Sequence, residues 1–221
     1  MVAARALILL LAVALALPGP RAARASECVA IESFSNAKVG EFPSDWKPRK
    51  DEGLSVYAVR QEGPLRFLRA TSRGLGIQAA KEQEWNLAAY PILAWSWRPM
   101  EFPKGSDERK SKTNDSALSV YAVFPHSPVS VKSLKYIWSA VVPVGTELTS
   151  SKGLTQVRVV RSGAQKIGQW VDEQVNVLED YRKRFEEKEV PKPAGIAVLT
   201  DSDETKSSAQ GDYANFRVCK P

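Results

Sequence analysis

The chain has 221 residues, of which 31 are Lys or Arg and 25 are Asp or Glu, and its formal net charge is +6. This length is sufficient for one domain with a full hydrophobic core. Three of the arginines belong to an N-terminal segment without acidic residues, so 28 basic and 25 acidic residues remain beyond it. The remaining charges are mixed in sign along the chain, and we expect no nucleic-acid-binding surface.

The N-terminal segment has the pattern of a secretory signal peptide. Arg5 precedes an apolar run over Ala6–Leu17, and a small-x-small cleavage pattern follows at Ala23–Ala25. The apolar run is shorter than the roughly 20 residues that a membrane-spanning helix needs. We therefore expect residues 1–25 to be removed and residues 26–221 to form one domain in the periplasm or outside the cell, without a transmembrane segment.

The two cysteines, Cys28 and Cys219, stand at opposite ends of the expected mature chain. In an oxidising compartment an isolated pair of this kind predicts a disulfide. This bond requires the first and last strands to lie together in the fold. Two isolated cysteines and a single histidine give no spacing typical of a transition-metal site.

Short apolar runs separated by Gly and Pro dominate the rest of the chain, and about ten of them are expected to be strands. They cover residues 29–34, 54–59, 65–70, 75–80, 92–98, 118–124, 134–142, 157–161, 196–200 and 216–219. Such a series predicts a mainly β, single-domain sandwich or jelly roll of the concanavalin-like type.

One segment departs from this β pattern. Apolar residues recur at steps of three and four from Val171 to Phe185, which predicts one amphipathic helix near residues 172–188. Asp172 is the expected N-cap, and Pro191 lies beyond the expected end. The helix is expected to pack over an edge or end of the sandwich.

Five stretches, taken in order, resemble a bacterial family of exported proteins, domain-of-unknown-function family 3047. They are LAWSWRPMEFPKG (93–105), NDSALSVYAVF (114–124), LKYIWS (134–139), GQWVDEQVNVLEDYRKRF (168–185) and GIAVLTDSDETKSSAQGDYANF (195–216). The resemblance covers nearly the whole expected mature chain. It implies a single exported, sandwich-like domain and carries no established activity.

Polar residues near the C-terminus form the first candidate site. Asp201, Asp203, Thr205 and Asp212 follow a spacing that resembles a calcium loop, and oxygen ligands of this kind suit a hard cation. An EF-hand is excluded because the flanking elements are expected to be strands. A calcium loop of another type and a simple polar turn that caps its own backbone both remain open. Asp115, in the long polar loop before another strand, is a further candidate for ligand binding.

Aromatic residues give a second set of candidates. Trp95 and Trp97 alternate with small or polar residues on one expected strand, and we assign them to the core. Trp46 stands between charged residues and near prolines, which predicts an exposed ring that could contact a ligand.

Three functions follow as hypotheses. The first is a non-catalytic binding module for a glycan or another component of the cell envelope, using Asp115, Asp201, Asp203, Thr205, Asp212 or Trp46. The second is a carbohydrate-active enzyme that uses two of these carboxylates. The third is a structural or interaction protein of the envelope. The sequence shows no motif for a serine triad and no glycine loop for phosphate.

Overall fold

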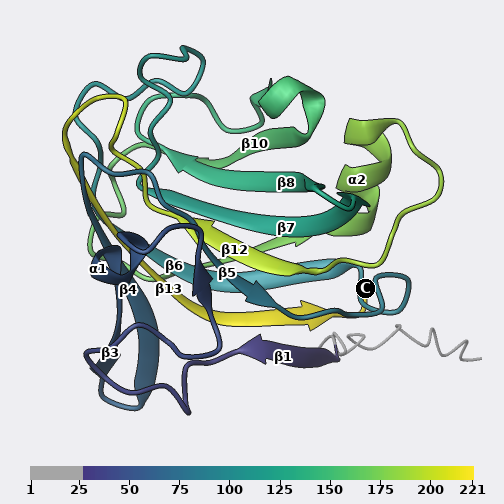
Figure 1. The fold of residues 1–221 in the computed structure, drawn as a ribbon, viewed down its shortest axis with the longest axis horizontal. Coiled ribbons are helices and arrows are strands. Elements are labelled where there is room, and N and C mark those ends of the chain that lie inside the picture. The colour runs from purple at the N-terminus through teal and green to yellow at the C-terminus, as the bar shows by residue number, and fades with distance from the viewer. Residues whose placement is uncertain (1–26) are drawn as a thin grey trace, which may run out of the picture.

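The computed structural model describes residues 27–221, so the expected signal peptide at residues 1–25 lies outside the described residues. Two β-sheets face each other in a sandwich, which confirms the predicted fold (Figure 1). Sheet A has six strands: β11 (Val171–Asn176), β6 (Ile92–Glu101), β13 (Ser208–Cys219), β4 (Leu65–Arg73) and β3 (Tyr57–Glu62) in spatial order, with β1 (Cys28–Glu32) also paired to β13.

Sheet B has seven strands: β2 (Lys47–Pro48), β5 (Ala79–Glu82), β12 (Gly195–Leu199), β7 (Leu118–Ser127), β8 (Ser130–Ser139), β10 (Thr155–Ser162) and β9 (Glu147–Ser150). Their neighbours are antiparallel except for the parallel pair β8 and β10. Three short helical segments lie between strands: α1 (Gly53–Val56), η1 (Ser151–Gly153) and α2 (Val177–Phe185). Among the described residues, no helix has the length and apolar character that a membrane crossing requires.

Aromatic side chains from both sheets fill the space between them. Trp95 and Trp97 are fully buried, as the sequence predicted. The ring of Trp95 lies 5.9 Å from Tyr136 of β8, and the ring of Trp97 lies 5.7 Å from Trp138 of the same strand. Because strand residues alternate between faces, the residues between these aromatics point away from the core.

The predicted helix begins later than expected. Residues 171–176 form β11, which pairs with β6, and the helix covers only Val177–Phe185. Val171 and Val175 fit both a helical face and a strand face, so their spacing could not distinguish the two. Asn176, rather than Asp172, is the N-cap, and its side chain accepts a hydrogen bond from the backbone N–H of Glu179. The helix packs at the end of the sandwich, where Tyr181 contacts Phe124.

The last strand brings the two ends of the chain together. Cys28 of β1 pairs in register with Cys219 of β13, and the predicted disulfide joins them. Strict alternation along β13 would place Tyr213 and Phe216 on opposite faces of the sheet. Instead the register shifts around Asn215, whose φ is +55°, and both aromatic rings are buried. This bulge therefore corrects the expected pattern of the strand.

Candidate functional site

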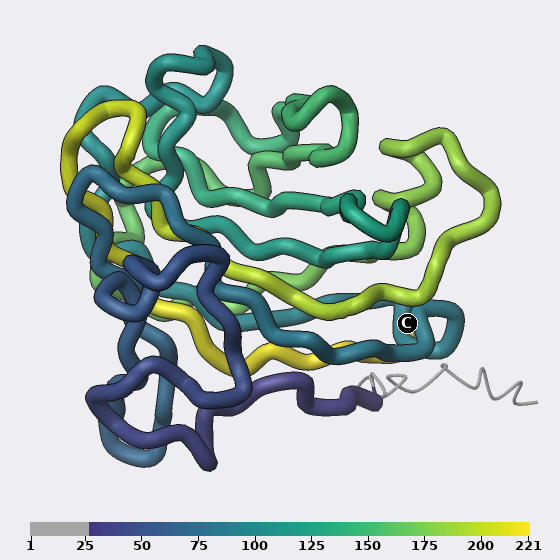
Figure 2. The backbone as a smooth tube through the Cα atoms, viewed as in Figure 1, coloured from purple at the N-terminus to yellow at the C-terminus, as the bar shows by residue number. Residues whose placement is uncertain are grey.

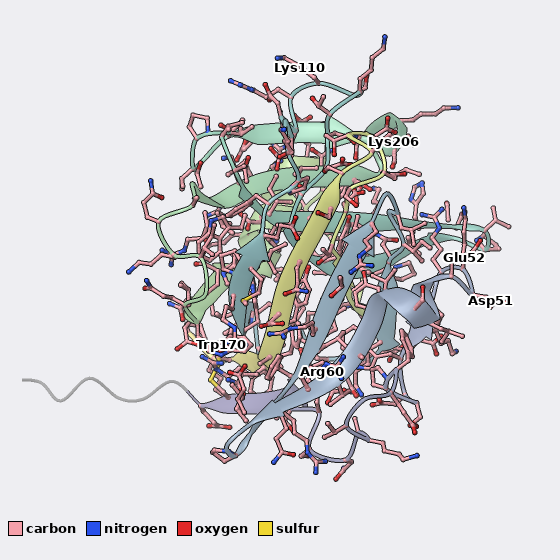
Figure 3. All side chains as sticks on the ribbon, turned by 90° about the vertical axis from the view of Figure 1, so that its left-hand side faces the viewer. Asp51, Glu52, Arg60, Lys110, Trp170 and Lys206 are labelled. Atoms are coloured by element: carbon pink, nitrogen blue, oxygen red, sulfur yellow. A yellow bond between two sulfur atoms is a disulfide. The ribbon has the colours of Figure 1, made fainter. Side chains whose placement is uncertain are left out.

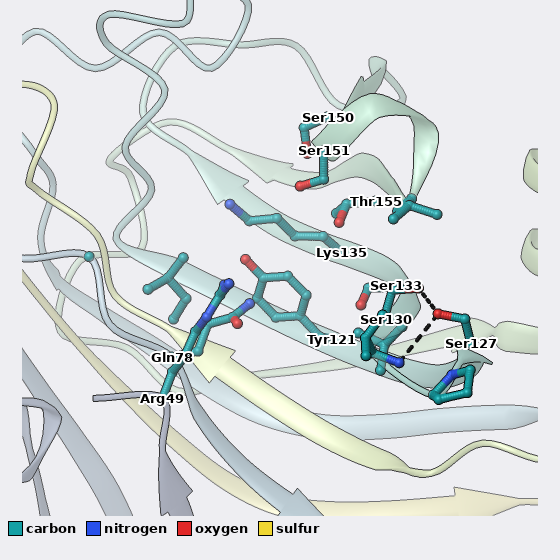
Figure 4. A pocket seen from close by; sticks show the side chains of 16 residues that line it. Arg49, Gln78, Tyr121, Ser127, Ser130, Ser133, Lys135, Ser150, Ser151 and Thr155 are labelled. Atoms are coloured by element: carbon teal, nitrogen blue, oxygen red, sulfur yellow. Dashed lines mark hydrogen bonds between the residues drawn. The ribbon is translucent and has the colours of Figure 1, made fainter. Parts of the chain in front are cut away.

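The outer face of sheet B carries a cleft of about 730 Å³ (Figure 4), a size typical of ligand sites. Tyr121 of β7 pairs in register with Lys135 of β8, and Lys135 pairs with Val157 of β10. Their neighbours along the strands, such as Val120 and Tyr136, belong to the core. Alternation therefore places Tyr121 and Lys135 side by side on the outer face.

The lining of the cleft is polar. Tyr121 is only 4% exposed and forms part of the floor. Arg49 and Gln78 lie on one side of it, and Ser150, Ser151 and Thr155 lie on the other (Figure 4). The backbone N–H of Arg49 donates to the carbonyl of Gln78 at 2.9 Å, which attaches the segment after β2 to the start of β5. Six serine or threonine side chains in total line the cleft.

Lys135 is the central charge of the cleft. Its Nζ lies 5.6 Å from the centre of the Tyr121 ring, a distance compatible with a cation–π contact. Burial lowers the pKa of the Lys135 ammonium, but interactions with Tyr121 and Asp201 outweigh burial and raise this pKa above its usual value. The ion pairs among residues 27–221 include neither Lys135 nor Arg49. The cleft therefore presents positive charge that no carboxylate of the described chain neutralises by direct contact.

Three aspartates form a separate group at one end of the sandwich, which we call the acidic cluster: Asp115, Asp201 and Asp203. β12 and β7 are antiparallel neighbours, so the segment after Leu199 meets the segment before Leu118. The backbone N–H of Asp201 donates to the carbonyl of Ser116 at 3.0 Å. The two loops lie side by side (Figure 2), and Lys110 and Lys206 mark them at the same end of the molecule in Figure 3.

Asp115 anchors the loop that follows β12. Its carboxylate is fully buried and accepts hydrogen bonds from the backbone N–H groups of Glu204 and Thr205, at 3.2 and 2.8 Å. It also accepts one from the Thr205 hydroxyl at 2.5 Å. The structure therefore brings Asp115 and Thr205 together as partners, and the polar turn that the sequence suggested is capped by a distant residue.

Asp201 is the least satisfied member of the cluster. It is 8% exposed, and its Oδ1 is buried without a hydrogen-bond donor among the described residues. Burial raises its pKa to about 8, with Lys135 acting in the opposite direction and the carboxyls of Asp203 and Asp115 adding to the increase. One carboxylate oxygen of each of Asp115, Asp201 and Asp203 lies within 4.8 Å of the corresponding oxygens of the other two.

Two other predicted site residues lie elsewhere. Asp212 is on the outer face of sheet A, where it is fully buried and accepts hydrogen bonds from Arg69 and Arg98 at 2.7–2.9 Å. It therefore does not join Asp201 and Asp203 in a cation site. Trp46 is buried rather than exposed, and its ring stacks on Phe34 while its Nε1 donates to Glu32. The predicted exposure of Trp46 is thus wrong, and its ring is covered by its neighbours.

The sequence reasoning missed the residues that line the cleft. Lys135 stands between Leu134 and Tyr136, so its charge in the middle of an apolar strand indicated an outward-facing position. Arg49 and Thr155 carry no comparable signal, because only the pairing of strands distant in sequence brings them to the same face.

A family model described as a protein of unknown function, DUF3047, matches residues 44–217. A comparison with curated proteins gave no match. Among solved structures, a carbohydrate-binding module specific for non-crystalline cellulose, CBM28, is 8% identical with a TM-score of 0.42, and the match covers 87% of this chain and 94% of that chain. The Trichoderma harzianum endoglucanase 3 of family GH12 is 11% identical with a TM-score of 0.42, over 90% and 99% of the two chains.

The xyloglucanase domain of NopAA from Sinorhizobium fredii is 11% identical with a TM-score of 0.37, over 82% of this chain and 97% of that chain. At these identities and TM-scores the function has to be derived from the side chains of the present chain. The family match is of a different kind, because it spans most of the described residues in sequence. The chain belongs to the family DUF3047.

Proposed function

We propose that this protein is an exported, non-catalytic module that binds an anionic glycan in the cleft on sheet B. The observation that carries the proposal is the half-buried Lys135 ammonium, which lies in a polar cleft and has no ion-pair partner in the described chain. Interactions with Tyr121 and Asp201 keep this ammonium charged, and no carboxylate of the described chain is in direct contact with it. A carboxylate on a bound sugar would form a charge-assisted hydrogen bond with it.

The other lining groups suit the hydroxyls of a sugar. Serine and threonine hydroxyls and the Gln78 amide both donate and accept hydrogen bonds. The exposed Arg49 adds a second positive charge at the side of the cleft. Because the Tyr121 ring is covered, we expect this residue to contribute its hydroxyl rather than a stacking surface. The expected ligand is therefore a uronic-acid glycan recognised by charge and hydrogen bonds.

The disulfide is consistent with export, since such bonds persist in oxidising compartments. Together with the signal-peptide pattern, it supports placing the protein in the periplasm or outside the cell. In either place, glycans of the cell envelope or of the surroundings are available as ligands.

Hydrolysis is the second candidate function, and the raised pKa of Asp201 beside Asp203 favours it. A neutral and an ionised carboxyl close together can serve as acid and base in glycoside hydrolysis. However, neither carboxylate lines the cleft; Gly76, which packs against both, lines it instead. Asp115 does not line the cleft either, and its carboxylate accepts three hydrogen bonds from the adjacent loop. We therefore expect binding without release of reducing ends from the glycan.

The proposal is tested on a glycan array that contains neutral, uronic and sulfated oligosaccharides. Wild-type protein is compared with Lys135→Met, which keeps the length of the side chain and removes its charge. Lys166→Met, in an exposed loop between β10 and β11, is the matched control. A charged hydrogen bond contributes about 1.5–3 kcal/mol, so Lys135→Met should weaken uronate binding about 10- to 100-fold.

Binding to uronic oligosaccharides that is lost only in Lys135→Met supports the proposal. Equal binding of neutral sugars by all three proteins contradicts the anionic ligand. Preference for sulfated over uronic glycans assigns a sulfate to the same positive charge and contradicts the uronate. The absence of binding to every glycan class contradicts the function itself, and release of reducing ends favours the enzyme.

A further inference from the structure

We propose that the acidic cluster, which lies outside the cleft, is a binding site for a hard divalent cation and that this cation is calcium. Asp115, Asp201 and Asp203 would each supply a carboxylate oxygen. The site differs from the loop suggested by the sequence, since Asp115 takes the position that Asp212 was expected to fill. It does not depend on the proposed glycan ligand.

The first observation is the spacing of the oxygens. One oxygen from each carboxylate lies within 4.8 Å of the other two. Calcium binds oxygen at about 2.3–2.6 Å, so two oxygens on one ion lie up to about 5 Å apart. The three aspartates are therefore already placed as a partial coordination shell, and backbone carbonyls or water would complete it.

The second observation is the unpartnered oxygen of Asp201. This residue is more than nine-tenths buried, and its Oδ1 receives no hydrogen bond from an N–H or hydroxyl group of the described chain; the polar group beside it is the carboxyl of Asp203. Nearly all buried polar atoms in folded proteins have a partner, and an exception calls for an explanation. A bound cation at Oδ1 would supply the missing interaction.

Gly76 keeps space for this convergence. A Cβ added at residue 76 would lie 2.7 Å from Oδ1 of Asp201 and 2.8 Å from Oδ1 of Asp203. A side chain there would have to displace one of the two oxygens. The absence of a side chain lets both oxygens point into the same space.

The acidic cluster also differs from another buried carboxylate in having no ion pair. The other fully buried carboxylate, Asp212, forms ion pairs with Arg69 and Arg98. No ion pair to Asp115, Asp201 or Asp203 is found within residues 27–221. The nearest positive influence on Asp201 is Lys135, which acts without direct contact. Three carboxyl groups, two of them buried and that of Asp203 partly exposed, therefore share a site to which no Lys or Arg of the described chain is directly bound.

The chemistry of the donors favours calcium. All three are hard oxygen donors, which suit calcium, magnesium or manganese rather than zinc or copper. Magnesium requires near-ideal octahedral geometry and gives up its water reluctantly, whereas calcium accepts irregular shells of six to eight oxygens. Calcium sites in extracellular modules bind at about 10⁻⁴–10⁻³ M, and we expect an affinity in this range.

The test is thermal unfolding of the purified protein in chelator, in 10 mM calcium and in 10 mM magnesium. Calcium at about ten times its Kd raises the ratio of folded to unfolded protein about 11-fold, which corresponds to a Tm about 3–6 °C higher for a domain of this size. Asp203→Asn, whose side chain is half-exposed, should remove the shift without loss of the fold. Asp51→Asn, in an exposed turn, should keep it.

Calorimetric titration with calcium chloride then gives the stoichiometry, expected to be one ion per chain. The proposal is overturned by an unchanged Tm in calcium, by an equal shift in magnesium, or by a shift that Asp203→Asn retains. If Asp203→Asn does not fold, Asp201→Asn takes its place in the same measurements. The glycan array is repeated in calcium and in chelator, so that failure of calcium binding is distinguished from failure of the glycan proposal.

Discussion

Removal of the disulfide should cost this domain a large part of its stability. Cys28 and Cys219 are separated by 191 positions, so the bond closes nearly the whole described chain into one loop. The chain-entropy relation for a loop of this length gives about 5 kcal/mol at 25 °C. The free energy of unfolding of a typical domain is about 5–15 kcal/mol. The double variant Cys28→Ala, Cys219→Ala should therefore be marginal or unfolded at 37 °C.

The assay is guanidinium-induced unfolding of the double variant and of each single variant, followed by tryptophan fluorescence. Either single change breaks the same bond, so the two changes together should cost little more than one. The slope of free energy against denaturant should rise, because the unfolded chain without a cross-link exposes more surface. A loss of less than about 1 kcal/mol in the double variant, or strictly additive single losses, would refute the reasoning.

Two further predictions concern charges outside the cleft. Asp212→Asn leaves Arg69 and Arg98 without their buried carboxylate, and should lower the free energy of unfolding by about 3–5 kcal/mol; a loss below 1 kcal/mol in urea titrations would contradict this. Asp107 accepts hydrogen bonds from Arg109 at 2.7 and 2.8 Å, and this pairing holds the pKa of its carboxyl well below the usual range. A depressed folded-state pKa contributes stability above the unfolded-state pKa of about 3.9 and loses it as the pH falls further. Asp107→Asn should therefore flatten the decline in stability below about pH 4, and an unchanged decline would argue against the pair.

Local patterns were sufficient to predict much of the fold. Short apolar segments such as Leu118–Phe124, and the clearer alternation of Val157–Arg161, with turn residues between the segments, indicated a sandwich. The position of the two cysteines predicted the pairing of the first and last strands. Local patterns were ambiguous for residues 171–175, which fit both a helical and a strand period but form a strand. Alternation also misplaced part of β13, because the bulge at Asn215 changes which face the following residues point to.

The candidate sites were harder to predict because they depend on contacts between distant segments. Asp201 and Asp203 were predicted to belong to a polar turn or a calcium loop, but only the pairing of β12 with β7 places Asp115 beside them. Asp212 is near Asp201 in sequence, yet it lies on a strand of sheet A and is neutralised by two arginines. Trp46 has charged neighbours, but its ring turns inward onto Phe34. Sequence neighbours alone contain no information about such placements.

The most direct test of the central claim is calorimetric titration with one uronic oligosaccharide and its carboxyl-reduced counterpart. The two ligands differ only in the carboxylates that Lys135 is proposed to bind, which are neutral hydroxymethyl groups in the reduced counterpart. Wild-type protein and Lys166→Met should bind the reduced ligand about 10- to 100-fold more weakly than the uronate, and Lys135→Met should bind both with similar affinity. Equal affinity of the wild type for both ligands, or an undiminished preference for the uronate in Lys135→Met, would contradict the proposed role of the cleft.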